Sequence, residues 1–289
     1  MARLASQMRA GFYPTPPEVI PGITSTIQPA AHKGSRVLDP CAGEGQFLHD
    51  TAVSLNLMPF GVELNPERAQ TAAQLLNGLG QQRPDLVPGR NHHILESDYR
   101  LIHCPNDAFS LAIVNPPYDL DYESRRLEYQ WLKQVRPWLQ PNGILVYIIP
   151  QHVLGTKVVA DYIASWFTDV QVVRFPDATY PRFKQIVLFG RRLPHRQILR
   201  PQTVARYQQI ARMGEQLRPL TTVTTPIYTL PKPVISARQF TFRRQFINPD
   251  EAVAEAAALG VHTHPDWQAH LAPETGIDGP VRPVMPLKI

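Results

Sequence analysis

The chain has 289 residues, of which 43% are hydrophobic, and it contains 30 prolines and two cysteines. This length accommodates one large α/β domain with or without a smaller one, and the hydrophobic content excludes a chain that is disordered throughout. Two cysteines exclude a disulfide framework. The sequence contains neither a signal peptide nor an apolar run of membrane-spanning length, so we expect a cytoplasmic protein without membrane contact.

The net charge of +5 is unevenly distributed along the chain. Residues 191–250, which we call the Arg-rich segment, contain eleven basic residues, ten of them arginine, and only two acidic residues. Because lysine and arginine neutralise phosphates, this asymmetry predicts a nucleic-acid partner, by preference DNA, bound through the Arg-rich segment. The alternative is a solvated basic surface without a partner.

The first expected element begins near Thr15. Pro16 or Pro17 can occupy the first turn of a helix, with Thr15 as the N-cap and Val19 and Ile20 inside the helix. Taken alone, this pattern predicts the start of a helix and indicates no chemistry.

A short apolar strand ends at Asp39, and a glycine loop, Gly43 to Gly45, leads into a helical pattern. Glycines let a ligand approach the backbone closely, and the N–H groups of the helix point toward it. Leu48 stands where a dinucleotide fingerprint has its third glycine, and Asp39 repels phosphate, so the loop favours a cationic ligand. Cys41 is interpreted as a small packing residue rather than a nucleophile.

Two further acidic residues close expected strands. Glu63 ends the strand 57–63 and follows Asp39 by 24 residues, a spacing typical of the acid that holds ribose hydroxyls in nucleotide-binding βαβ units. The strand 92–97 ends at Asp98, which is placed to accept a hydrogen bond from an adenine amino group. The alternative for Asp98 is a simple turn at the end of a strand.

The apolar run 111–114 reads as a buried parallel strand, and Asn115-Pro116-Pro117-Tyr118 follows it directly. The prolines stiffen the backbone where open α/β sheets bind ligands. The Asn115 side-chain oxygen and the Pro116 carbonyl can accept both protons of a planar amino group, and Tyr118 offers a face for stacking. The alternative is an ordinary Pro-Pro turn.

The remaining elements of this half alternate between helices and strands. The spacing predicts a helix that buries both Trp131 and Trp138, and a turn at 141–143. Strands are expected at 144–149, 170–175 and 185–189, with a helix at 160–166. In the loop before the last strand, Phe183, beside Lys184, is either a second stacking face for a base or a core residue. This alternation predicts a doubly wound, mainly parallel sheet.

Taken in this order, the motifs resemble the class I S-adenosylmethionine-dependent N6-adenine DNA methyltransferases of the TaqI-like (gamma) group. The resemblance covers residues 11–190 and rests on Tyr13 to Pro17, Asp39 to Phe47, Glu63, Asp98 and Asn115 to Tyr118. It implies a Rossmann-like fold, with a seven-stranded, mostly parallel sheet and an antiparallel last strand. It also implies S-adenosylmethionine as cofactor and no metal. It is compatible with a role in restriction-modification or phage defence, and housekeeping is the alternative.

The resemblance also assigns roles to residues. The implied cofactor-binding residues are Tyr13, Thr15, Pro16, Asp39, Pro40, Ala42, Gly43, Gly45, Phe47, Glu63, Leu64, Asp98, Tyr99 and Asn115. The implied catalytic residues are Asn115, Pro116, Pro117 and Tyr118, and the implied substrate-binding residues are Tyr118, Phe183 and Lys184. The expected reaction is direct methyl transfer to the N6 amino group of a flipped adenine.

Three alternatives to this reaction remain open. The same Asn-Pro-Pro-Tyr element occurs in glutamine methyltransferases that act on release factors, because a glutamine amide is also a planar amine; those enzymes carry a helical domain before the cofactor loop. RNA adenine methylation is the second alternative. The third is a non-catalytic subunit that binds nucleic acid and retains the fold.

Residues 1–192 are expected to form the cofactor-binding catalytic domain, and residues 193–289 a basic, proline-rich extension of mixed structure containing β-strands. In the extension the patterns predict a partial helix at 204–217, strands at 234–236 and 240–244, and a helix at 251–259. The spacing of His262, His264 and His270 matches no standard metal site. The apolar end 285–289 predicts either a missing C-terminal part or a protein partner.

Overall fold

The computed structural model describes residues 14–87, 93–117, 127–221 and 225–245. One compact unit spans Met1–Gln245. It therefore extends past residue 192, the boundary expected from the sequence. The second unit, Phe246–Ile289, lies outside the described residues, and so do the helix expected at 251–259 and the three C-terminal histidines.

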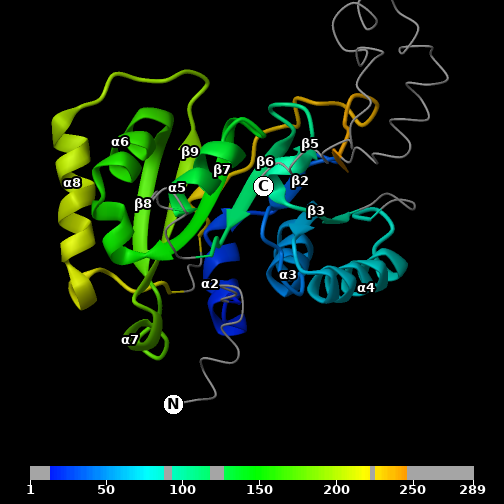
Figure 1. The fold of residues 1–289 in the computed structure, drawn as a ribbon, viewed down its shortest axis with the longest axis horizontal. Helices are drawn as coiled ribbons and strands as arrows, with labels where there is room; N and C mark the ends of the chain where they lie inside the picture. Colours follow the sequence, from blue (N-terminus) through cyan, green and yellow to red (C-terminus); the bar gives the residue numbers. More distant parts are fainter. Residues whose placement is uncertain (1–13, 88–92, 118–126, 222–224, 246–289) are drawn as a thin grey trace, which may run out of the picture. The chain divides into compact units, whose positions relative to one another are not determined.

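A seven-stranded sheet with the order β4-β3-β2-β6-β7-β9-β8 organises the compact unit (Figure 1). All pairings among β4, β3, β2, β6 and β7 are parallel, whereas β9 is antiparallel to both β7 and β8. The expected mostly parallel sheet with an antiparallel last strand is thereby confirmed. The strands are β2 (Arg36–Asp39), β3 (Met58–Glu63), β4 (Ile94–Glu96), β6 (Phe109–Val114), β7 (Leu139–Pro150), β8 (Phe167–Arg174) and β9 (Gln185–Arg192).

Helices cover both faces of the sheet because its central strands are apolar on both sides. Successive side chains of a strand point to opposite faces. Leu111 and Ile113 of β6 accordingly join one buried cluster, and Ala112 and Val114 join the other. The first face is covered by α2 (Ile20–Thr24), α3 (Gln46–Leu55) and α4 (Pro66–Gln82), and the second by α5 (Leu127–Val135), α6 (Lys157–Trp166) and α8 (Pro201–Arg212).

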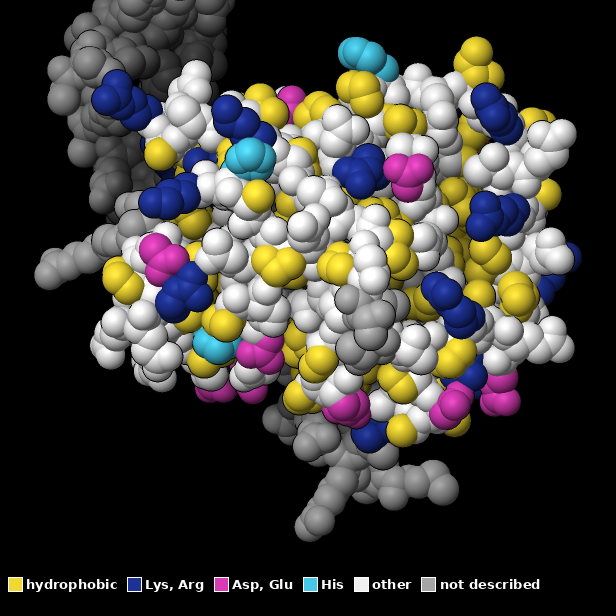
Figure 2. All heavy atoms as spheres, turned by 180° about the vertical axis from the view of Figure 1, so that it is seen from behind, with side chains coloured by type: hydrophobic (Ala, Val, Ile, Leu, Met, Phe, Trp, Pro, Cys, Tyr) yellow, Lys and Arg dark blue, Asp and Glu magenta, His cyan; other side chains and the backbone are white. Residues whose placement is uncertain are grey.

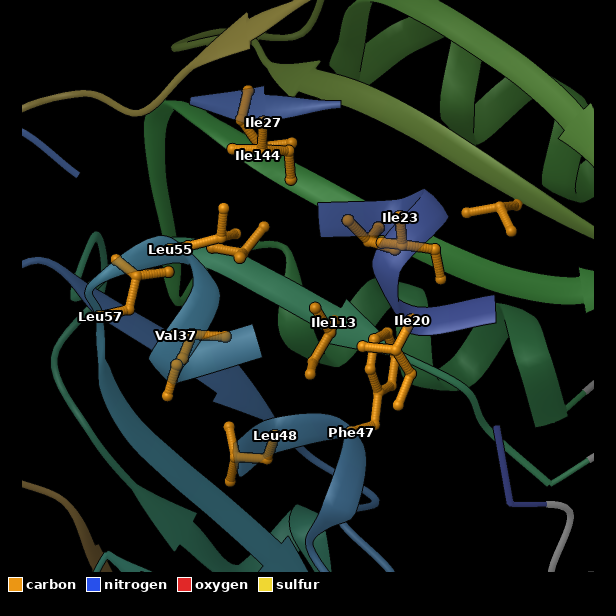
Figure 3. Close-up of a cluster of buried hydrophobic side chains, with 14 of the residues drawn as sticks. Ile20, Ile23, Ile27, Val37, Phe47, Leu48, Leu55, Leu57, Ile113 and Ile144 are labelled. Atoms are coloured by element: carbon orange, nitrogen blue, oxygen red, sulfur yellow. The ribbon is translucent and has the colours of Figure 1, made fainter. Parts of the chain in front are cut away.

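Figure 3 shows the first cluster at its centre, where side chains of α2 and α3 meet the sheet. Ile20 and Ile23 of α2 point toward Ile113 of β6, and Phe47 lies at the start of α3 close to Ile20. Ile20, Ile23 and Ile113 are almost completely buried. The helix α2 is therefore part of the core, and it anchors the described residues 14–19 that lead into it.

The turn expected at 141–143 is wrong, because β7 runs without interruption from Leu139 to Pro150. The register between β6 and β7 shifts at this point, and Asn142 adopts a left-handed backbone with φ of 62°. Asparagine tolerates this conformation better than most residues. The residues 141–143, which the sequence predicts as a turn, thus form a bulge inside one long strand.

Residues 226–245, which we call the strap, run along the edge of the sheet where the parallel strands begin. Gln140 binds the strap through a hydrogen bond from its Nε2 to the Lys232 carbonyl at 2.8 Å. Arg36 donates from Nη1 to the Ile235 carbonyl at 3.0 Å, and its guanidinium lies 4.1 Å from the centre of the Phe240 ring. The strand expected at 234–236 is wrong: this stretch bends, and side chains rather than a neighbouring strand satisfy its backbone.

Two short pairings complete the path of the strap. Tyr228–Thr229 (β10) pairs in parallel with Ile27–Gln28 (β1), and Arg243–Arg244 (β11) pairs antiparallel with Ile102–His103 (β5). The extension up to residue 245 is thus folded against the seven-stranded sheet. No helix among the described residues is both long and apolar enough to cross a membrane.

Candidate active site

The candidate site lies along the carboxyl edge, by which we mean the edge of the sheet where β2, β3, β4, β6 and β7 end. The order of the strands places β2 between β3 and β6. Asp39 is the last residue of β2, Glu63 is the last residue of β3, and Asn115 follows β6 directly. Three of the polar residues singled out in the sequence therefore end adjacent strands.

The glycine loop between β2 and α3 is held tightly against α4. Gly45 has φ of 87°, and a Cβ atom on it would lie 2.9 Å from the Ala72 Cβ and 3.0 Å from the Ala72 Cα. The Ala42 N–H donates to the Val62 carbonyl at 2.9 Å, which ties the loop to β3. Position 45 therefore requires glycine both for its backbone conformation and for the space beside α4. Pro40, Ala42, Gly43 and Phe47 are buried around it.

Glu63 is 6% exposed, and its carboxylate already has several protein partners. Its Oε2 accepts from the Gly43 N–H at 2.9 Å, which connects the acid to the glycine loop. Its Oε1 accepts from the Asn65 N–H at 2.9 Å and from Arg68, through Nη2 at 2.7 Å and Nε at 3.0 Å. A carboxylate has about four lone-pair positions, so the capacity left for a ligand lies on Oε2.

Arg68 is a residue of the site that the sequence patterns do not indicate. Its position in the first turns of α4 predicts an ordinary charged residue on a helix surface, but it reaches back five positions to Glu63. The spacing Glu63-x4-Arg68, with Asn65 as N-cap of α4 between them, is the signal that could have indicated this pair.

Asp39 is buried at the end of β2 with an N–H donor beside it. The Cys41 N–H donates to its Oδ1 at 3.0 Å. Burial, together with the negative charge of Glu63, nevertheless raises the pKa of Asp39 to about 7. A cationic ligand placed here would favour the ionised form, and a phosphate would not. The surroundings of Asp39 thus fit the cationic ligand that the sequence predicts.

Replacing Asp39 with asparagine is expected to flatten the dependence of stability on pH. The pKa of Asp39 is raised from an ordinary 3.8 to about 7 in the folded chain. Between these values the folded chain holds a proton that the unfolded chain has lost, so the stability from this group falls as the pH rises. Asparagine keeps an acceptor for the Cys41 N–H and carries no charge.

Thermal unfolding at pH 4 and pH 8, followed by circular dichroism, measures this difference. We expect the two proteins to have similar Tm values at pH 4 and the Asp39→Asn protein to be more stable by about 5 °C at pH 8. The same pH slope in both proteins would contradict the assignment of the raised pKa to Asp39.

Asn115 is half-buried and is contacted from two other parts of the chain. Its side-chain Nδ2 donates to the Thr15 Oγ1 at 3.0 Å, and its backbone carbonyl accepts from the Cys41 Sγ at 3.2 Å. The prediction that Thr15 is the N-cap of a helix is wrong. The 3-10 helix η1 (Pro17–Val19) has Pro16 as its N-cap, and α2 follows η1. The thiol of Cys41 has its pKa raised well above the ordinary value by burial. Cys41 therefore stays protonated.

The rest of the Asn-Pro-Pro-Tyr element is described only in part. Pro116 is buried and Pro117 is half-buried. Tyr118 lies outside the described residues, and so does Tyr13 at the N-terminal end of the other motif.

The residues after β4 form a separate group at the carboxyl edge. The Ser97 N–H donates to the Glu63 carbonyl at 3.0 Å, so the ends of β4 and β3 meet. Asp98 caps the short helix Tyr99–Leu101, and the hydrogen bonds that it accepts from Arg100 outweigh its burial and hold its pKa below the ordinary value. Tyr99 stacks on Trp131 with ring centroids 3.6 Å apart. Leu64, next to Glu63, is 69% exposed.

The other two predicted substrate-binding residues lie farther along the same edge. Lys184 is exposed and follows α7 (Tyr180–Phe183), and its carbonyl accepts from the Gln151 N–H at 2.9 Å. The backbone of Phe183 belongs to α7, but its side chain is not among the described parts. Trp131 and Trp138 are buried, as expected. Hydrogen bonds thus connect Thr15, Asp39, Cys41 and Asn115 in one group. They connect Gly43, Glu63 and Arg68 in an adjoining group. Among the described residues, Lys184 has hydrogen bonds to neither group.

This combination of fold and site defines a class I, Rossmann-like methyltransferase. A mostly parallel sheet with one antiparallel strand carries an acidic glycine loop at the end of its first long strand. The chain belongs to the uncharacterised methyltransferase family DUF6094, whose family model matches residues 1–233.

The chain is also similar to solved structures at low sequence identity. A Listeria monocytogenes protein assigned to the class I S-adenosylmethionine-dependent methyltransferases is 17% identical, with a TM-score of 0.49, over 73% of this chain and 77% of that chain. The M protein of the Type I restriction enzyme EcoKI is 18% identical, with a TM-score of 0.50, over 67% of this chain and 48% of that chain. A SAM-dependent O-methyltransferase from Thermotoga maritima is 13% identical, with a TM-score of 0.44, over 67% and 71%. The chain spans about half the length of the EcoKI M protein.

Proposed function

We propose that the protein transfers a methyl group from S-adenosylmethionine to the N6 amino group of adenine in DNA, and that it acts in the cytoplasm. The observation that carries the proposal is the position of Asn115. This residue offers an amide and a proline-stiffened backbone at the carboxyl edge, and Cys41 connects it to the acidic loop that suits a cationic ligand. Both described cysteines are free thiols, which agrees with a reducing compartment.

The side chains have distinct tasks in this proposal. The Asn115 amide oxygen and the Pro116 carbonyl accept the two N6 protons and draw the nitrogen toward a tetrahedral shape, which makes its lone pair available. Tyr118 stacks on the flipped base, with Phe183 as a second face and Lys184 beside it. These contacts hold the base in line with the methyl group, and orientation of this kind lowers much of the barrier.

The cofactor site is assembled from the acidic groups and the glycine loop. S-adenosylmethionine would supply a methyl group on a cationic sulfur: as the N–C bond forms and the S–C bond breaks, the cofactor would leave as a neutral thioether, and the proton lost from the amino group would pass to solvent. Asp39 would hold the cationic part, and Oε2 of Glu63 would accept a hydrogen bond from a ribose hydroxyl. Leu64, Asp98 and Tyr99 border the adenine end, and the side chain of Arg100 must move away if Asp98 is to accept from the adenine amino group.

The experiment that tests this function identifies the methylated product. The purified protein is incubated with S-adenosylmethionine carrying a labelled methyl group and, in separate reactions, with duplex DNA, single-stranded RNA and a glutamine-rich protein. Digestion to nucleosides or amino acids and mass spectrometry are expected to show N6-methyladenine from DNA. Label found instead in RNA adenine or in glutamine would replace the proposal with the corresponding activity. Cofactor binding without any transfer would identify a non-catalytic subunit.

We further propose that only part of the Arg-rich segment contacts the nucleic acid. Arg192 is buried in an ion pair with Asp107 at the edge opposite to the candidate site, and Arg191 donates to the Thr229 carbonyl there. In contrast, the segment after α8 lies at the carboxyl edge: the Arg218 carbonyl accepts from the N–H of Arg174, the last residue of β8. The last turn of α8 lies there as well, because Gln151 donates to the Ile210 carbonyl. Arg212 and Arg218 are both exposed.

Charge density alone does not single out this surface. On the face shown in Figure 2, lysine and arginine side chains are scattered over the surface instead of forming one patch. The position relative to the carboxyl edge must therefore distinguish the basic residues that meet the nucleic acid from those that do not. The two ends of α8 provide a matched comparison, because Arg196 and Arg200 are also exposed and lie near the other end of this helix.

The double variant Arg212→Gln and Arg218→Gln is expected to bind DNA more weakly than the matched double variant Arg196→Gln and Arg200→Gln. Loss of two phosphate contacts reduces the slope of log K against log salt by about 2. Fluorescence anisotropy with a labelled 30-base-pair duplex between 50 and 200 mM salt measures this slope for both proteins. Equal slopes in the two variants would contradict the proposed surface, whatever reaction the enzyme catalyses.

A further inference from the structure

Asn115 is held at both its side chain and its backbone by residues that are distant in sequence. Thr15 accepts a hydrogen bond from the Asn115 Nδ2 at 3.0 Å, across 100 positions of sequence. The Cys41 thiol donates to the Asn115 carbonyl at 3.2 Å, which is within the range for sulfur, across 74 positions. The local pattern around Thr15 predicts a helix cap, but the η1 N-cap makes no side-chain cap hydrogen bond and is Pro16. The Thr15 hydroxyl therefore contacts Asn115 instead of a helix end.

We propose that Thr15 and Cys41 are positioning residues for Asn115: together they fix the catalytic amide, and Thr15 acts on the chemical step and not on binding of the cofactor. This inference rests on the proposed function, because it assigns catalysis to Asn115. It differs from the role that the sequence suggests for Thr15, which is contact with the cofactor.

The hydrogen-bonding geometry gives the reason for this assignment. An amide carries its donor and its acceptor at opposite ends of one plane. The contact with Thr15 holds the N–H end of Asn115, so the side chain cannot rotate without breaking this bond. The oxygen end is the end that has to meet the amino group of the substrate. Small displacements of a reacting group reduce the rate strongly. Loss of the hydrogen bond between Asn115 and Thr15 should therefore lower kcat.

Cys41 acts on the backbone of the same residue. Burial raises the pKa of its thiol well above the ordinary value, so the S–H remains a donor and is a poor nucleophile. Asn115 directly follows β6 and precedes two prolines. The thiol provides a partner for the Asn115 carbonyl and connects it to the loop of Asp39, whose Oδ1 accepts from the Cys41 N–H.

N-terminal packing supports the role of Thr15. Val19 and Ile20, which follow within five positions, are buried at 0% and 2% exposure against the sheet. Thr26 donates from its Oγ1 to the Ile23 carbonyl at 2.7 Å and ties the end of α2. The segment is thus anchored in the core close to Thr15, and the hydroxyl has a fixed place from which to hold Asn115.

Four single variants test the proposal in pairs. Thr15→Val keeps the shape of the side chain and removes the hydroxyl, while Thr15→Ser keeps the hydroxyl. Cys41→Ala removes the donor, while Cys41→Ser retains one. We expect kcat to fall about 10-fold in Thr15→Val and about 3-fold in Cys41→Ala, with recovery in the two serine variants. The Kd of S-adenosylmethionine, measured by calorimetry, is expected to change less than 2-fold in Thr15→Val.

Two results would overturn the inference. One is a Thr15→Val protein with unchanged kcat and weakened cofactor binding, which would make Thr15 a cofactor contact. The other is an equal loss of kcat in the valine and serine variants at position 15, which would indicate a packing role.

A readout without turnover separates this inference from the proposed reaction. The side-chain NH2 signals of Asn115 in a ¹H–¹⁵N spectrum are assigned by their disappearance in Asn115→Asp. They are expected to shift and to exchange faster with solvent in Thr15→Val and to return in Thr15→Ser. Unchanged signals in Thr15→Val would refute the contact itself. If these signals respond while no methyl transfer to adenine occurs, the proposed function fails and the contact stands.

Discussion

Replacing Asn115 with alanine is expected to lower kcat for adenine methylation by at least about 10²-fold to 10³-fold. The loss follows from removal of a hydrogen-bond acceptor that strengthens its interaction as the N6 nitrogen becomes tetrahedral, and loss of one such group typically has this effect. The measurement is the steady-state rate of N6-methyladenine formation at saturating cofactor and DNA. A rate equal to that of the parent would reject the catalytic assignment of Asn115.

Asn115→Asp is the matched variant. A carboxylate preserves the acceptor at the same distance along the side chain, but it removes the N–H that donates to Thr15. We therefore expect Asn115→Asp to retain more activity than Asn115→Ala and less than the parent. Equal losses of kcat in both variants would show that the N–H that donates to Thr15 is as important for the reaction as the side-chain oxygen.

Replacing Gly45 with alanine is expected to disrupt both the fold and the cofactor loop. The new Cβ would lie 2.9 Å from the Ala72 Cβ and 3.0 Å from the Ala72 Cα, and the backbone would keep a φ of 87° that disfavours alanine. Because one contact is with the backbone of α4, the loop has to shift. We expect a loss of about 3 kcal/mol of unfolding free energy and at least about 10-fold weaker binding of S-adenosylmethionine.

Gly34→Ala supplies the control for Gly45→Ala. Gly34 has a comparable φ of 80°, but a Cβ atom there would meet nothing within 4 Å. Backbone strain alone costs about 1–2 kcal/mol, so this variant should lose only that amount and bind the cofactor normally. Urea unfolding and calorimetry of both proteins measure the two effects. If Gly34→Ala were destabilised as much as Gly45→Ala, the close approach of the loop to α4 would not matter.

The sequence predicts the carboxyl edge well, because its chemistry follows directly after apolar runs. Asp39, Glu63 and Asn115 each end or follow a buried strand, and adjacent parallel strands bring such residues together. The helices of the first half also follow their apolar spacing. What these patterns cannot reveal is which partner a polar residue finds when the partner is distant in sequence.

Thr15 illustrates this limit of local patterns. Threonine before two prolines is a good helix cap by propensity, but the hydroxyl finds Asn115 instead, 100 positions away. Arg68 shows the same on a smaller scale, since a helix-surface arginine becomes the partner of Glu63. The β-prone stretch 234–236 forms no strand, because side chains bind its backbone groups. The Val234 N–H donates to the Gln140 side chain, and the Ile235 carbonyl accepts from Arg36.

The Arg-rich segment shows why a count of charges cannot locate a binding surface. The sequence predicts Arg192 as a phosphate contact, because it belongs to the Arg-rich segment. In the structure its side chain is only 7% exposed and pairs with Asp107. Arg212 and Arg218 are similar in sequence context and come to lie near the carboxyl edge. The fold of the sheet, and not the local composition, decides which arginines lie near the carboxyl edge and which lie at the opposite edge.

The strap has a practical consequence for anyone who shortens this chain. Phe240 and Phe242 of the strap cover Phe60 and Phe109, with ring centroids 4.7–6.1 Å apart, and Arg36 is only 3% exposed beneath them. A fragment that stopped at residue 192 would lack the strap and would expose Phe60, Phe109 and the otherwise buried Arg36 to solvent. Exposed aromatic surface of this kind favours aggregation. A recombinant fragment of the catalytic sheet should therefore continue through Gln245.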